Sequence, residues 1–317
     1  MNESEVIDRL RRIATDPAAR GLQDDAALLD GLVITHDSLA EGVHFLSTDP
    51  PASVGWKLVA VNLSDLAAKG ATPVGALLSL VLSESEWDTA LIGGIEAACE
   101  SYGLPLIGGD TIALPAEAPR VYGLTAIGRA GEKTPSRSGG KAGDLLWVAG
   151  TLGDSASGLA QLVDNPAATG PLVDIFRRPI PLLEMGRALA GHARAMMDVS
   201  DGLLIDLSRL CAASGCGAEI DLESLPLSRA FIAERGQLRP SRLFAATGGD
   251  DYALLAALPD DLDPVSLSLP REPNLTCIGR LVAGSGLKLQ DRDGDVPLPE
   301  QLGYEHRTSS SPMDGGL

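Results

Sequence analysis

The stretch VNLSDLAAKGATP, residues 61–73, places one carboxylate on a helix whose other side chains are mostly apolar or small. One face repeats apolar residues at three- and four-residue spacing, which predicts packing in a core; it comprises Trp56, Val59, Leu63, Leu66 and Ala67. Asn62, Asp65 and Lys69 fall together on a second face of the same helix. This second face is predicted to point at a polar partner, and the rest of the chain must fold around both faces.

Glycine and proline mark the end of this helix. Gly70 follows the last apolar position, where a left-handed C-cap favours a residue without a Cβ atom. Pro73 stops the helix before a strand-like apolar run at residues 74–82. Taken alone, a surface helix with a solvated Asp65 explains the pattern equally well, but four further Asp-bearing segments favour a functional site.

Length and composition indicate a globular chain of about two domains. Its 317 residues are 44% hydrophobic, which is enough apolar material for two cores. The net charge of -18 and an aromatic content of 3% disfavour a nucleic-acid partner, because phosphates are repelled and few rings can stack on bases. An anionic substrate would therefore need metal ions.

Targeting signals and cysteine usage bear on the compartment. The N-terminus lacks the apolar core of a signal peptide, and the longest apolar run, residues 74–82, is too short to span a bilayer, so we expect no membrane partner. The cysteines show no metal-binding spacing, which predicts buried free thiols in a reducing compartment and a cytoplasmic protein. They are Cys99, Cys211, Cys216 and Cys277.

An Asp pair precedes a predicted hairpin. Asp30-Gly31 favours a type I′ turn between strands at residues 26–29 and 32–35. Counting outward from the turn, Asp24 faces Asp37, and like charges at facing positions destabilise a ladder. A bound cation or a departure from regular pairing would remove that repulsion. The alternative is that both carboxylates simply fray into water.

Three more acidic segments are predicted at glycine turns beside apolar strands. Gly108–Thr111 follows the apolar run 104–107, a usual place for ligand chemistry in α/β sheets, although it is also an ordinary turn. In MMDVSDGLLIDL, Asp198 and Asp201 flank the start of a helix and are able to share a cation; a capping motif is the alternative. In GGDDY, Asp250 and Asp251 precede a strand.

The remaining pattern alternates helices and strands in two halves. Helices are predicted at residues 4–13, 87–102, 155–163, 181–190, 203 onward and 227–235, and strands at 121–130, 145–149, 195–197, 217–222, 252–258, 275–281 and 286–290. The polar stretch 131–143 is the predicted boundary. It gives an N-terminal domain at 1–138, a C-terminal domain at 139–306 and a loose tail at 307–317. The segment GTLGDSASGL opens a helix whose N-terminus suits an anion, unless Asp154 merely caps it.

The acidic segments are best explained as parts of one site. Two like charges 4 Å apart repel by about 4 kcal/mol at an effective dielectric of 20, so a carboxylate cluster persists only with cations among it. Oxygen ligands select hard ions such as Mg²⁺, which binds carboxylates together with phosphate oxygens. This points to a nucleoside triphosphate, yet the sequence has no P-loop, no GxGxxG opening a helix and no protein-kinase motifs. Nor does it show an activated nucleophile, which in-line phosphoryl transfer does not need.

A set of ordered motifs resembles the thiamine-monophosphate kinase family along nearly the whole chain. The motifs are GLQDDAALL, THDSLAEGVHF, VNLSDLAAKGATP, LIGGDT, SRSG, GTLGDSASGL, DVSDGLLIDL and GGDDYAL. The resemblance implies an α/β (α+β type) fold shared with aminoimidazole ribonucleotide synthetase: an N-terminal domain that binds ATP and Mg²⁺ and whose sheet forms a homodimer, and a C-terminal α/β domain. It also implies the reaction of ATP with thiamine monophosphate to give ADP and thiamine diphosphate.

The resemblance also implies roles for individual residues. Several Mg²⁺ ions are expected, with ligands at Asp25, Thr35, Asp37, Asp65, Asp110, Asp198 and Asp201, and with Asp24 as the alternative to Asp25. ATP contacts are expected at Gly109, Asp110, Arg137, Ser200 and Tyr102. Substrate contacts are expected at His44, Asp250 and Tyr304. The residues expected to act directly in catalysis are Asp65, Asp198 and Asp201.

Three positions depart from the family pattern. Asp250 stands where a substrate-contacting Glu is usual, and His36 replaces a hydroxyl residue between Thr35 and Asp37. Gln23 stands where a glycine usually precedes the Asp pair, which bears on how closely the backbone approaches phosphate. The hairpin count favours an Asp24 position opposite Asp37, whereas the family pattern favours Asp25; a β-bulge would reconcile them.

Three functions fit these observations. The first is the kinase, and the second is another ATP-dependent enzyme of the same superfamily that acts on a different small molecule. The third is a non-catalytic nucleotide-binding protein. Carboxylates at every predicted metal turn disfavour the third, and the His44 segment with the GGDD turn favours the first over the second.

Overall fold

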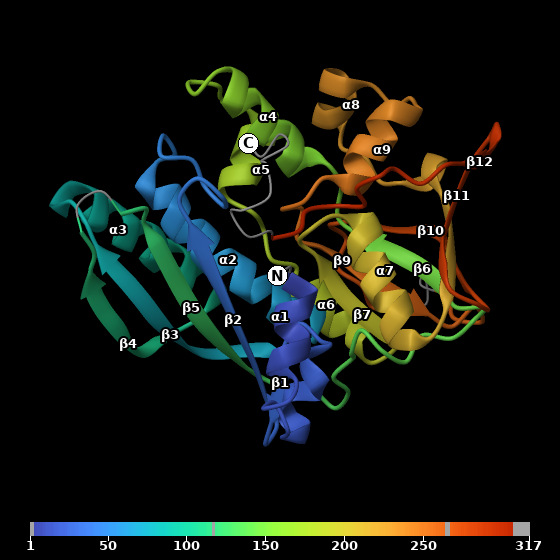
Figure 1. The fold of residues 1–317 in the computed structure, drawn as a ribbon, viewed down its shortest axis with the longest axis horizontal. Coiled ribbons are helices and arrows are strands. Elements are labelled where there is room, and N and C mark those ends of the chain that lie inside the picture. Colours follow the sequence, from blue (N-terminus) through green and yellow to red (C-terminus); the bar gives the residue numbers. More distant parts are fainter. Residues whose placement is uncertain (1–2, 116–117, 264–266, 307–317) are drawn as a thin grey trace.

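The computed structural model describes residues 3–115, 118–263 and 267–306. The predicted loose tail at 307–317 lies outside these ranges. The chain forms two lobes, each built on its own β-sheet, with the first half of the sequence in one lobe and the second half in the other (Figure 1). This arrangement agrees with the predicted two-part α/β architecture.

Within the described residues, the first half builds a five-stranded mixed sheet. In spatial order its strands are β1 (Ala27–Leu29), β2 (Leu32–Ala40), β5 (Val121–Arg129), β3 (Thr72–Leu82) and β4 (Leu106–Ala113). β3 and β4 run parallel, and the other neighbours run antiparallel. β1 and β2 form the predicted hairpin, because Asp30 and Gly31 adopt the left-handed conformations that its turn requires, with φ of 49° and 80°.

Two long helices follow strands of this first sheet. α2 (Pro51–Ala68) packs across β2 and β5, and α3 (Ser85–Tyr102) packs against α2. The α2 and α3 backbones approach closely because glycines face the contact: a Cβ atom at Gly55 would lie 2.2 Å from the carbonyl oxygen of Leu91. Two short segments precede the sheet, α1 (Glu3–Leu10) and the 3₁₀ helix η1 (Pro17–Leu22).

The described residues of the second half build a seven-stranded mixed sheet. In spatial order its strands are β12 (Gly294–Val296), β11 (Gly286–Asp291), β8 (Gly217–Asp221), β10 (Leu275–Val282), β6 (Leu145–Ala149), β9 (Ala253–Leu258) and β7 (Ala195–Val199). Every residue of β7 and β9 is buried, which explains why β9 reads as a continuous apolar run.

In chain order, helices lie between the strands of the second half. They are α4 (Asp154–Asp164), α5 (Pro171–Arg177), α6 (Leu183–Ala190), α7 (Leu203–Ser214), α8 (Arg229–Arg235) and α9 (Arg239–Thr247), with the 3₁₀ helix η2 at Leu222–Ser224. α7 contacts β7, β8 and β11, and α4 packs along α5. The sequence analysis missed α5, α9 and β12, which are short elements of seven, nine and three residues.

α2 is the element that both halves share. It contacts α3, β2 and β5 in the first half and α6, β7 and β9 in the second. All of its residues from Ser53 to Ala68 except Trp56 are buried, including the charged Lys57 and Asp65. The interpretation of a surface helix with a solvated Asp65 is therefore wrong. Gly70 has a φ of 62°, as the predicted left-handed end of the helix requires.

Two of the predicted turns are strand residues instead. Gly108–Thr111 lie inside β4, where they pair with Leu77–Leu80 of β3. Gly109 is needed for close approach, because a Cβ atom there would lie 2.0 Å from the Leu78 carbonyl oxygen. Asp198 lies within β7 and not in the turn that follows it. Local glycine content predicted a turn, whereas pairing with a distant strand decides the conformation.

Two broader expectations concern cysteines and the membrane. Cys99, Cys211, Cys216 and Cys277 are all free thiols, as predicted, although only Cys211 and Cys216 are fully buried. Among the residues that the structure describes, no helix has both the length and the apolar character needed to cross a bilayer.

The contact between α2 and α6 gives a test of the fold. A Cβ atom at Gly186 would lie 2.0 Å from the backbone oxygen of Ala67 at the end of α2, so Gly186→Ala must push the halves apart. We expect it to lower the free energy of unfolding by about 1–3 kcal/mol, measured by urea denaturation. The control is Gly191→Ala, at the end of the same helix, where a Cβ atom meets nothing within 4 Å. Equal stability of the two variants would contradict the packing.

Candidate active site

The polar face of α2 is buried where the two halves meet. Asn62 accepts a hydrogen bond from the Asp37 backbone N–H at 2.9 Å, which fixes β2 against the helix. Ser64 donates to Asp198 of β7 at 2.6 Å. Thr35 of β2 donates its hydroxyl hydrogen bond to Asp65. Side chains of α2 therefore link a strand of each sheet.

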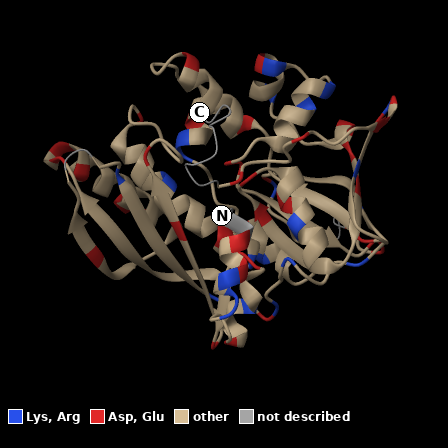
Figure 2. Ribbon diagram, viewed as in Figure 1, with Lys and Arg blue, Asp and Glu red and all other residues tan. Residues whose placement is uncertain are grey.

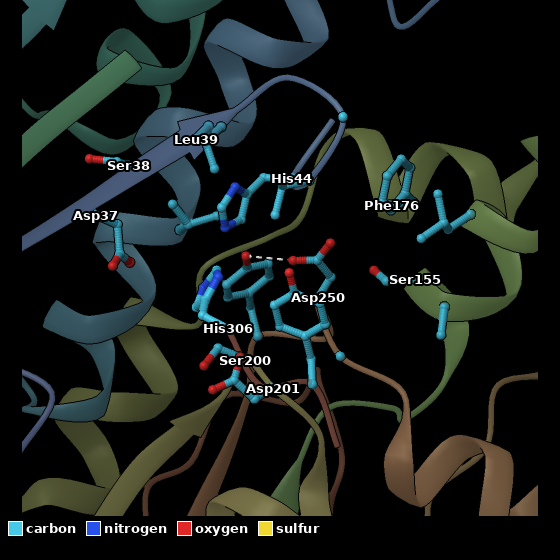
Figure 3. A pocket seen from close by; sticks show the side chains of 18 residues that line it. Asp37, Ser38, Leu39, His44, Ser155, Phe176, Ser200, Asp201, Asp250 and His306 are labelled. Atoms are coloured by element: carbon cyan, nitrogen blue, oxygen red, sulfur yellow. Dashed lines mark hydrogen bonds between the residues drawn. The ribbon is translucent and has the colours of Figure 1, made fainter. Parts of the chain in front are cut away.

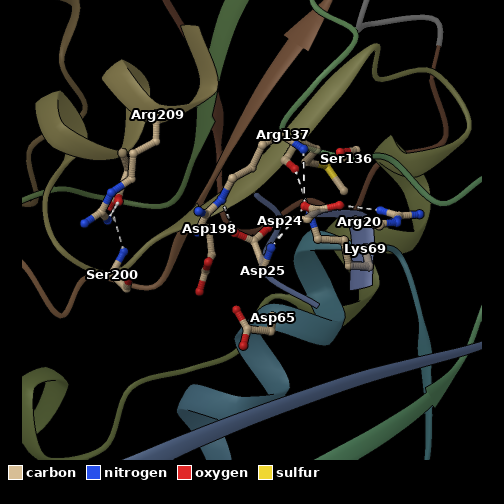
Figure 4. Close-up of polar contacts among 12 residues, drawn as sticks. Arg20, Asp24, Asp25, Asp65, Lys69, Ser136, Arg137, Asp198, Ser200 and Arg209 are labelled. Carbon is tan, nitrogen blue, oxygen red and sulfur yellow. Dashed lines mark hydrogen bonds and ion pairs between the residues drawn. The ribbon is translucent and has the colours of Figure 1, made fainter. Parts of the chain in front are cut away.

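Three carboxylates converge beside this face of α2. Asp25, Asp65 and Asp198 each offer one oxygen atom, and these oxygens all lie within 4.8 Å of one another. The three residues come from the segment before β1, from α2 and from β7, and Figure 4 shows their side chains in one group. We refer to these three residues as the acidic cluster.

Burial makes the negative charges of the acidic cluster unfavourable. Burial raises the pKa of Asp65 well above its usual value, and the nearby carboxylates Asp37 and Asp198 raise it further. Burial also raises the pKa of Asp198 to about 8, with Asp25 adding to the effect and the Ser64 hydrogen bond opposing it. An oxygen-only donor set with uncompensated charge is the environment that a hard divalent cation would neutralise.

Two cationic side chains pair with Asp25 of the acidic cluster. The Arg137 Nε atom donates to Asp25 at 2.6 Å, and Lys69 pairs with the other oxygen of Asp25. Lys69 is fully buried and also donates to the backbone oxygen of Met196 at 3.2 Å. The charge of Asp25 is therefore shared between two cations that come from distant parts of the chain.

Asp24 lies outside the acidic cluster. Its two carboxylate oxygens pair with Lys69 and Arg20, and its side chain is 1% exposed. Although burial alone would raise it, Lys69 and Arg20 lower the pKa of Asp24 to about 2. β1 starts at Ala27, so the predicted facing positions of Asp24 and Asp37 never form. The Asp pair departs from regular strand pairing, and Asp25, not Asp24, belongs to the acidic cluster.

A cavity of about 470 Å³ opens beside Asp37, whose charge acts on Asp65 of the acidic cluster (Figure 3). Its lining includes six residues that the sequence analysis singled out: Asp37, His44, Ser200, Asp201, Asp250 and Tyr304. Asp37 and His44 come from the first half, and the other four come from the second. The residues expected to contact substrate thus meet in one cavity, next to part of the predicted metal set.

Aromatic side chains form one wall of this cavity. The His44 and His306 ring centroids are 5.6 Å apart, and those of His306 and Tyr304 are 5.0 Å apart. The Ala40 backbone N–H donates to His44 Nδ1 at 3.0 Å, so Nε2 carries the proton of the neutral ring. Burial lowers the pKa of His44, which favours this neutral form.

The GGDD turn also lines the cavity. Asp250 accepts hydrogen bonds from Lys57 Nζ at 2.8 Å and from the Tyr252 hydroxyl at 2.8 Å. Asp251 points elsewhere, accepting from the Gly153 N–H at 2.7 Å at the start of α4. Asp201 and Ser200 approach the cavity from the turn after β7, where Asp201 pairs with Arg209.

Some predicted residues are not brought together within one chain. Pairing through β5 and β3 places Asp37 in one row with Gly109, and Ser38 in the next row with Asp110. Because successive side chains point to opposite faces of a strand, Asp110 and Asp37 face opposite sides of the sheet. β2 and β4 are three strand positions apart, roughly 14 Å. Tyr102, at the end of α3, lines a separate cavity of about 650 Å³.

Sequence reasoning missed Lys57, Ser64 and Tyr252 as members of this site. Lys57 lies eight residues before Asp65, but at 3.6 residues per turn it is displaced by roughly 80–140° around the helix from Asp65, Lys69 and Asn62, so the polar face of α2 gave no signal for it. Ser64 and Tyr252 gave no signal, because a serine in a helix and a tyrosine before a strand are both ordinary.

Comparison with known proteins identifies the family. Residues 23–130 match the AIR synthase related protein N-terminal domain, and residues 141–292 match the AIR synthase related protein C-terminal domain. The chain therefore belongs to the AIR synthase related family.

Individual relatives narrow this assignment. The thiamine-monophosphate kinase of Salmonella typhimurium is 38% identical, with 94% of this chain and 95% of that protein covered. The structure of AaThiL complexed with AMPPCP and TMP superposes with a TM-score of 0.84 at 32% identity, covering 96% of this chain and 97% of that one. The thiamine-monophosphate kinase of Stenotrophomonas maltophilia gives a TM-score of 0.73 at 38% identity, covering 92% and 96%. Within the larger family, the chain is a member of the thiamine-monophosphate kinases.

The raised pKa values predict how pH and Mg²⁺ affect stability. The pKa of Asp198 is about 8 in the folded chain, whereas its ordinary value is 3.8, so between these values the folded state holds the extra proton. Without Mg²⁺, stability should therefore fall as pH rises from about 4 to 8. Because the cation replaces that proton, Mg²⁺ should raise the melting temperature more at pH 8 than at pH 6.

Differential scanning fluorimetry at matched ionic strength would measure this effect, with KCl as the control salt. In Asp198→Asn, the Mg²⁺-dependent rise at pH 8 should be largely lost. An undiminished rise in that variant would contradict the placement of a cation at the acidic cluster.

Proposed function

We propose that this protein is a thiamine-monophosphate kinase, which transfers the γ-phosphoryl group of ATP to thiamine monophosphate and releases ADP and thiamine diphosphate. The observation that carries the proposal is the junction of the acidic cluster with the cavity that holds His44, Asp250 and Tyr304. The relatives named above support the same reaction, since they are thiamine-monophosphate kinases that match nearly the full chain.

The donor set of the acidic cluster fits Mg²⁺. Asp25, Asp65 and Asp198 would hold the ion, with Asp37 and Asp201 nearby in the cavity. When bound, Mg²⁺ supplies charge neutralisation for phosphate oxygens. Ser64 and Thr35 orient two of the carboxylates through the hydrogen bonds described above, so the protein fixes the ligands before any ion arrives.

The cavity walls fit a cationic aromatic substrate. The thiazolium ring of thiamine monophosphate carries a positive charge, which aromatic faces and carboxylates attract. His44, His306 and Tyr304 supply the aromatic wall, and Asp250 supplies a carboxylate to the same cavity. The neutral His44 ring directs its Nε2 proton as a hydrogen-bond donor, because Nδ1 is occupied by the backbone.

The proposed reaction needs positioning more than covalent chemistry. Ser155 and Ser200 line the cavity, but neither has a hydrogen bond from its hydroxyl to a histidine base in the described structure, so neither resembles an activated nucleophile. We therefore propose direct in-line transfer, with the acceptor phosphate held next to the acidic cluster. The free thiols fit a reducing compartment, and we place the reaction in the cytoplasm.

An ADP-release assay tests the function. With ATP and Mg²⁺, thiamine monophosphate should stimulate ADP release above a panel of other phosphorylated small molecules. Asp65→Asn and Asp198→Asn should each lower kcat at least a hundredfold while the protein stays folded, because phosphate charge is left uncompensated in the transition state. The control is Asp291→Asn, which removes a carboxylate paired with Arg239 on the surface and should keep wild-type turnover.

Several outcomes of this assay would count against the proposal. Stimulation by another panel member, with none by thiamine monophosphate, would favour a different enzyme of the family. Wild-type turnover in both cluster variants would remove the assigned role of the acidic cluster. Recovery of labelled phosphate attached to the protein would contradict direct transfer.

We also propose that the active form is a homodimer through the first sheet. β4 is an edge strand in which every residue is exposed, and long exposed edges favour pairing with another chain. Leu77 and Ile112 lie in adjacent strands and are 40% and 44% exposed. A second copy on this surface would also bring its own Gly109 and Asp110 towards a nucleotide that the single chain leaves out of their reach.

Analytical ultracentrifugation tests the homodimer. The wild type should sediment with twice the mass of the chain, and Ile112→Asp should shift it to the monomer. Burying the new carboxylate in the apolar interface would cost more free energy than the dimer contact provides. Val163→Asp is the control, since Val163 is a similarly exposed apolar residue on α4 in the other half. A monomeric wild type at micromolar concentration would contradict the proposal.

A further inference from the structure

Lys57 is a buried cation that the acidic cluster does not use. It lies in the first half of α2, is 2% exposed, and is about two turns from Asp65. A lysine is rarely buried without partners, because removing its charge from water is costly. The contacts of Lys57 therefore indicate the role of its positive charge.

The ammonium group of Lys57 joins three separate segments. Its Nζ donates to the backbone oxygen of His44 at 3.0 Å and to the Asp250 carboxylate at 2.8 Å. It also lies 4.0 Å from the centre of the Phe176 ring in α5, a cation–π contact. His44, Asp250 and Phe176 all line the cavity, and they come from both halves of the chain.

Asp250 is held from a second direction as well. The Tyr252 hydroxyl donates to its other carboxylate oxygen at 2.8 Å. Asp250 and Tyr252 have φ of 66° and 51°, left-handed conformations that a residue other than glycine adopts only when its surroundings require it. The Asp250 N–H also donates to the Ser200 backbone oxygen at 2.7 Å. Lys57 is the contact that ties this strained turn to the other half.

We infer that Lys57 is a positioning residue for the substrate side of the cavity. It holds the Asp250 carboxylate and the His44 segment at one fixed separation, across the junction of the two halves. Its three ammonium hydrogens are accounted for by two hydrogen bonds and a ring face, so it acts through Asp250 and His44 and does not itself contact substrate. The inference rests on the proposed function, because it names how that cavity recognises thiamine monophosphate.

This role predicts an effect on one substrate only. Lys57→Met keeps the apolar stem of the side chain and removes the charge. We expect it to raise the KM for thiamine monophosphate at least tenfold and to change the KM for ATP less than twofold, because its contacts lie on the substrate walls and not at the acidic cluster. Lys57→Arg restores a charged donor to the same carboxylate and should recover part of the lost affinity.

A control variant separates positioning from stability. Arg194→Met removes the partner of the buried Asp144, an ion pair outside the cavity, and should lower the melting temperature without changing either KM. A double-variant experiment then tests the pathway through Asp250. Asp250→Asn alone should raise the KM for thiamine monophosphate, and adding Lys57→Met in that background should raise it less than threefold further.

The outcomes distinguish this inference from the proposed function. If the wild type does not phosphorylate thiamine monophosphate, the proposed function fails. If it does, an unchanged KM in Lys57→Met, measured below its melting temperature, overturns the positioning role. A full tenfold effect of Lys57→Met in the Asp250→Asn background overturns action through Asp250. Where Lys57→Met does not fold, Lys57→Arg and Asp250→Asn disturb the same ion pair from either side, and an unchanged KM in both overturns the inference.

Discussion

The repulsion among buried carboxylates is the constraint on which the rest of this structure depends. Each pair of like charges at about 4 Å costs about 4 kcal/mol at an effective dielectric of 20, and burial adds a solvation cost to each charge. Hydroxyl groups of Thr35 and Ser64 donate hydrogen bonds to these carboxylates, and two cations, Lys69 and Arg137, pair with them. These partners, drawn in part in Figure 4, offset part of the charge, and a divalent cation would neutralise the remainder.

α2 connects the acidic cluster to the packing of both lobes. Its apolar residues belong to a core that includes residues of both halves, among them Leu189 and Leu254. Its polar residues reach the second half through Ser64 to Asp198, Lys57 to Asp250 and Lys69 to the backbone of Met196. The two lobes therefore meet through apolar packing as well as through charged and hydrogen-bonded contacts. Charged residues elsewhere are spread over both lobes (Figure 2). The site residues Lys57, Ser64 and Lys69 also join the two lobes, so a change at these contacts affects both the site and the packing between lobes.

The sequence was informative where structure is local. The Asp30-Gly31 turn, the left-handed end of α2 at Gly70 and the apolar strands of both sheets follow from residue type and spacing. Prediction failed where distant pairing decides, as at Gly108–Thr111, which β3 holds in a strand. The choice between Asp24 and Asp25 depends on Lys69, Arg20 and Arg137, and Lys57 meets Asp250 across 193 positions. No local pattern encodes such contacts.

The departures from the family pattern are absorbed in different ways. Gln23 has a φ of -118°, a conformation open to any residue, so the segment before the Asp pair does not require glycine there. The His36 ring bonds to Thr125 at 2.9 Å, on the sheet face opposite Thr35 and Asp37, so it takes no place at the acidic cluster. Asp250 is the departure that bears on the cavity. Its side chain is one methylene shorter than glutamate, and Lys57 and Tyr252 hold both of its oxygens, so the position of the shorter carboxylate is set by its partners more than by its own reach.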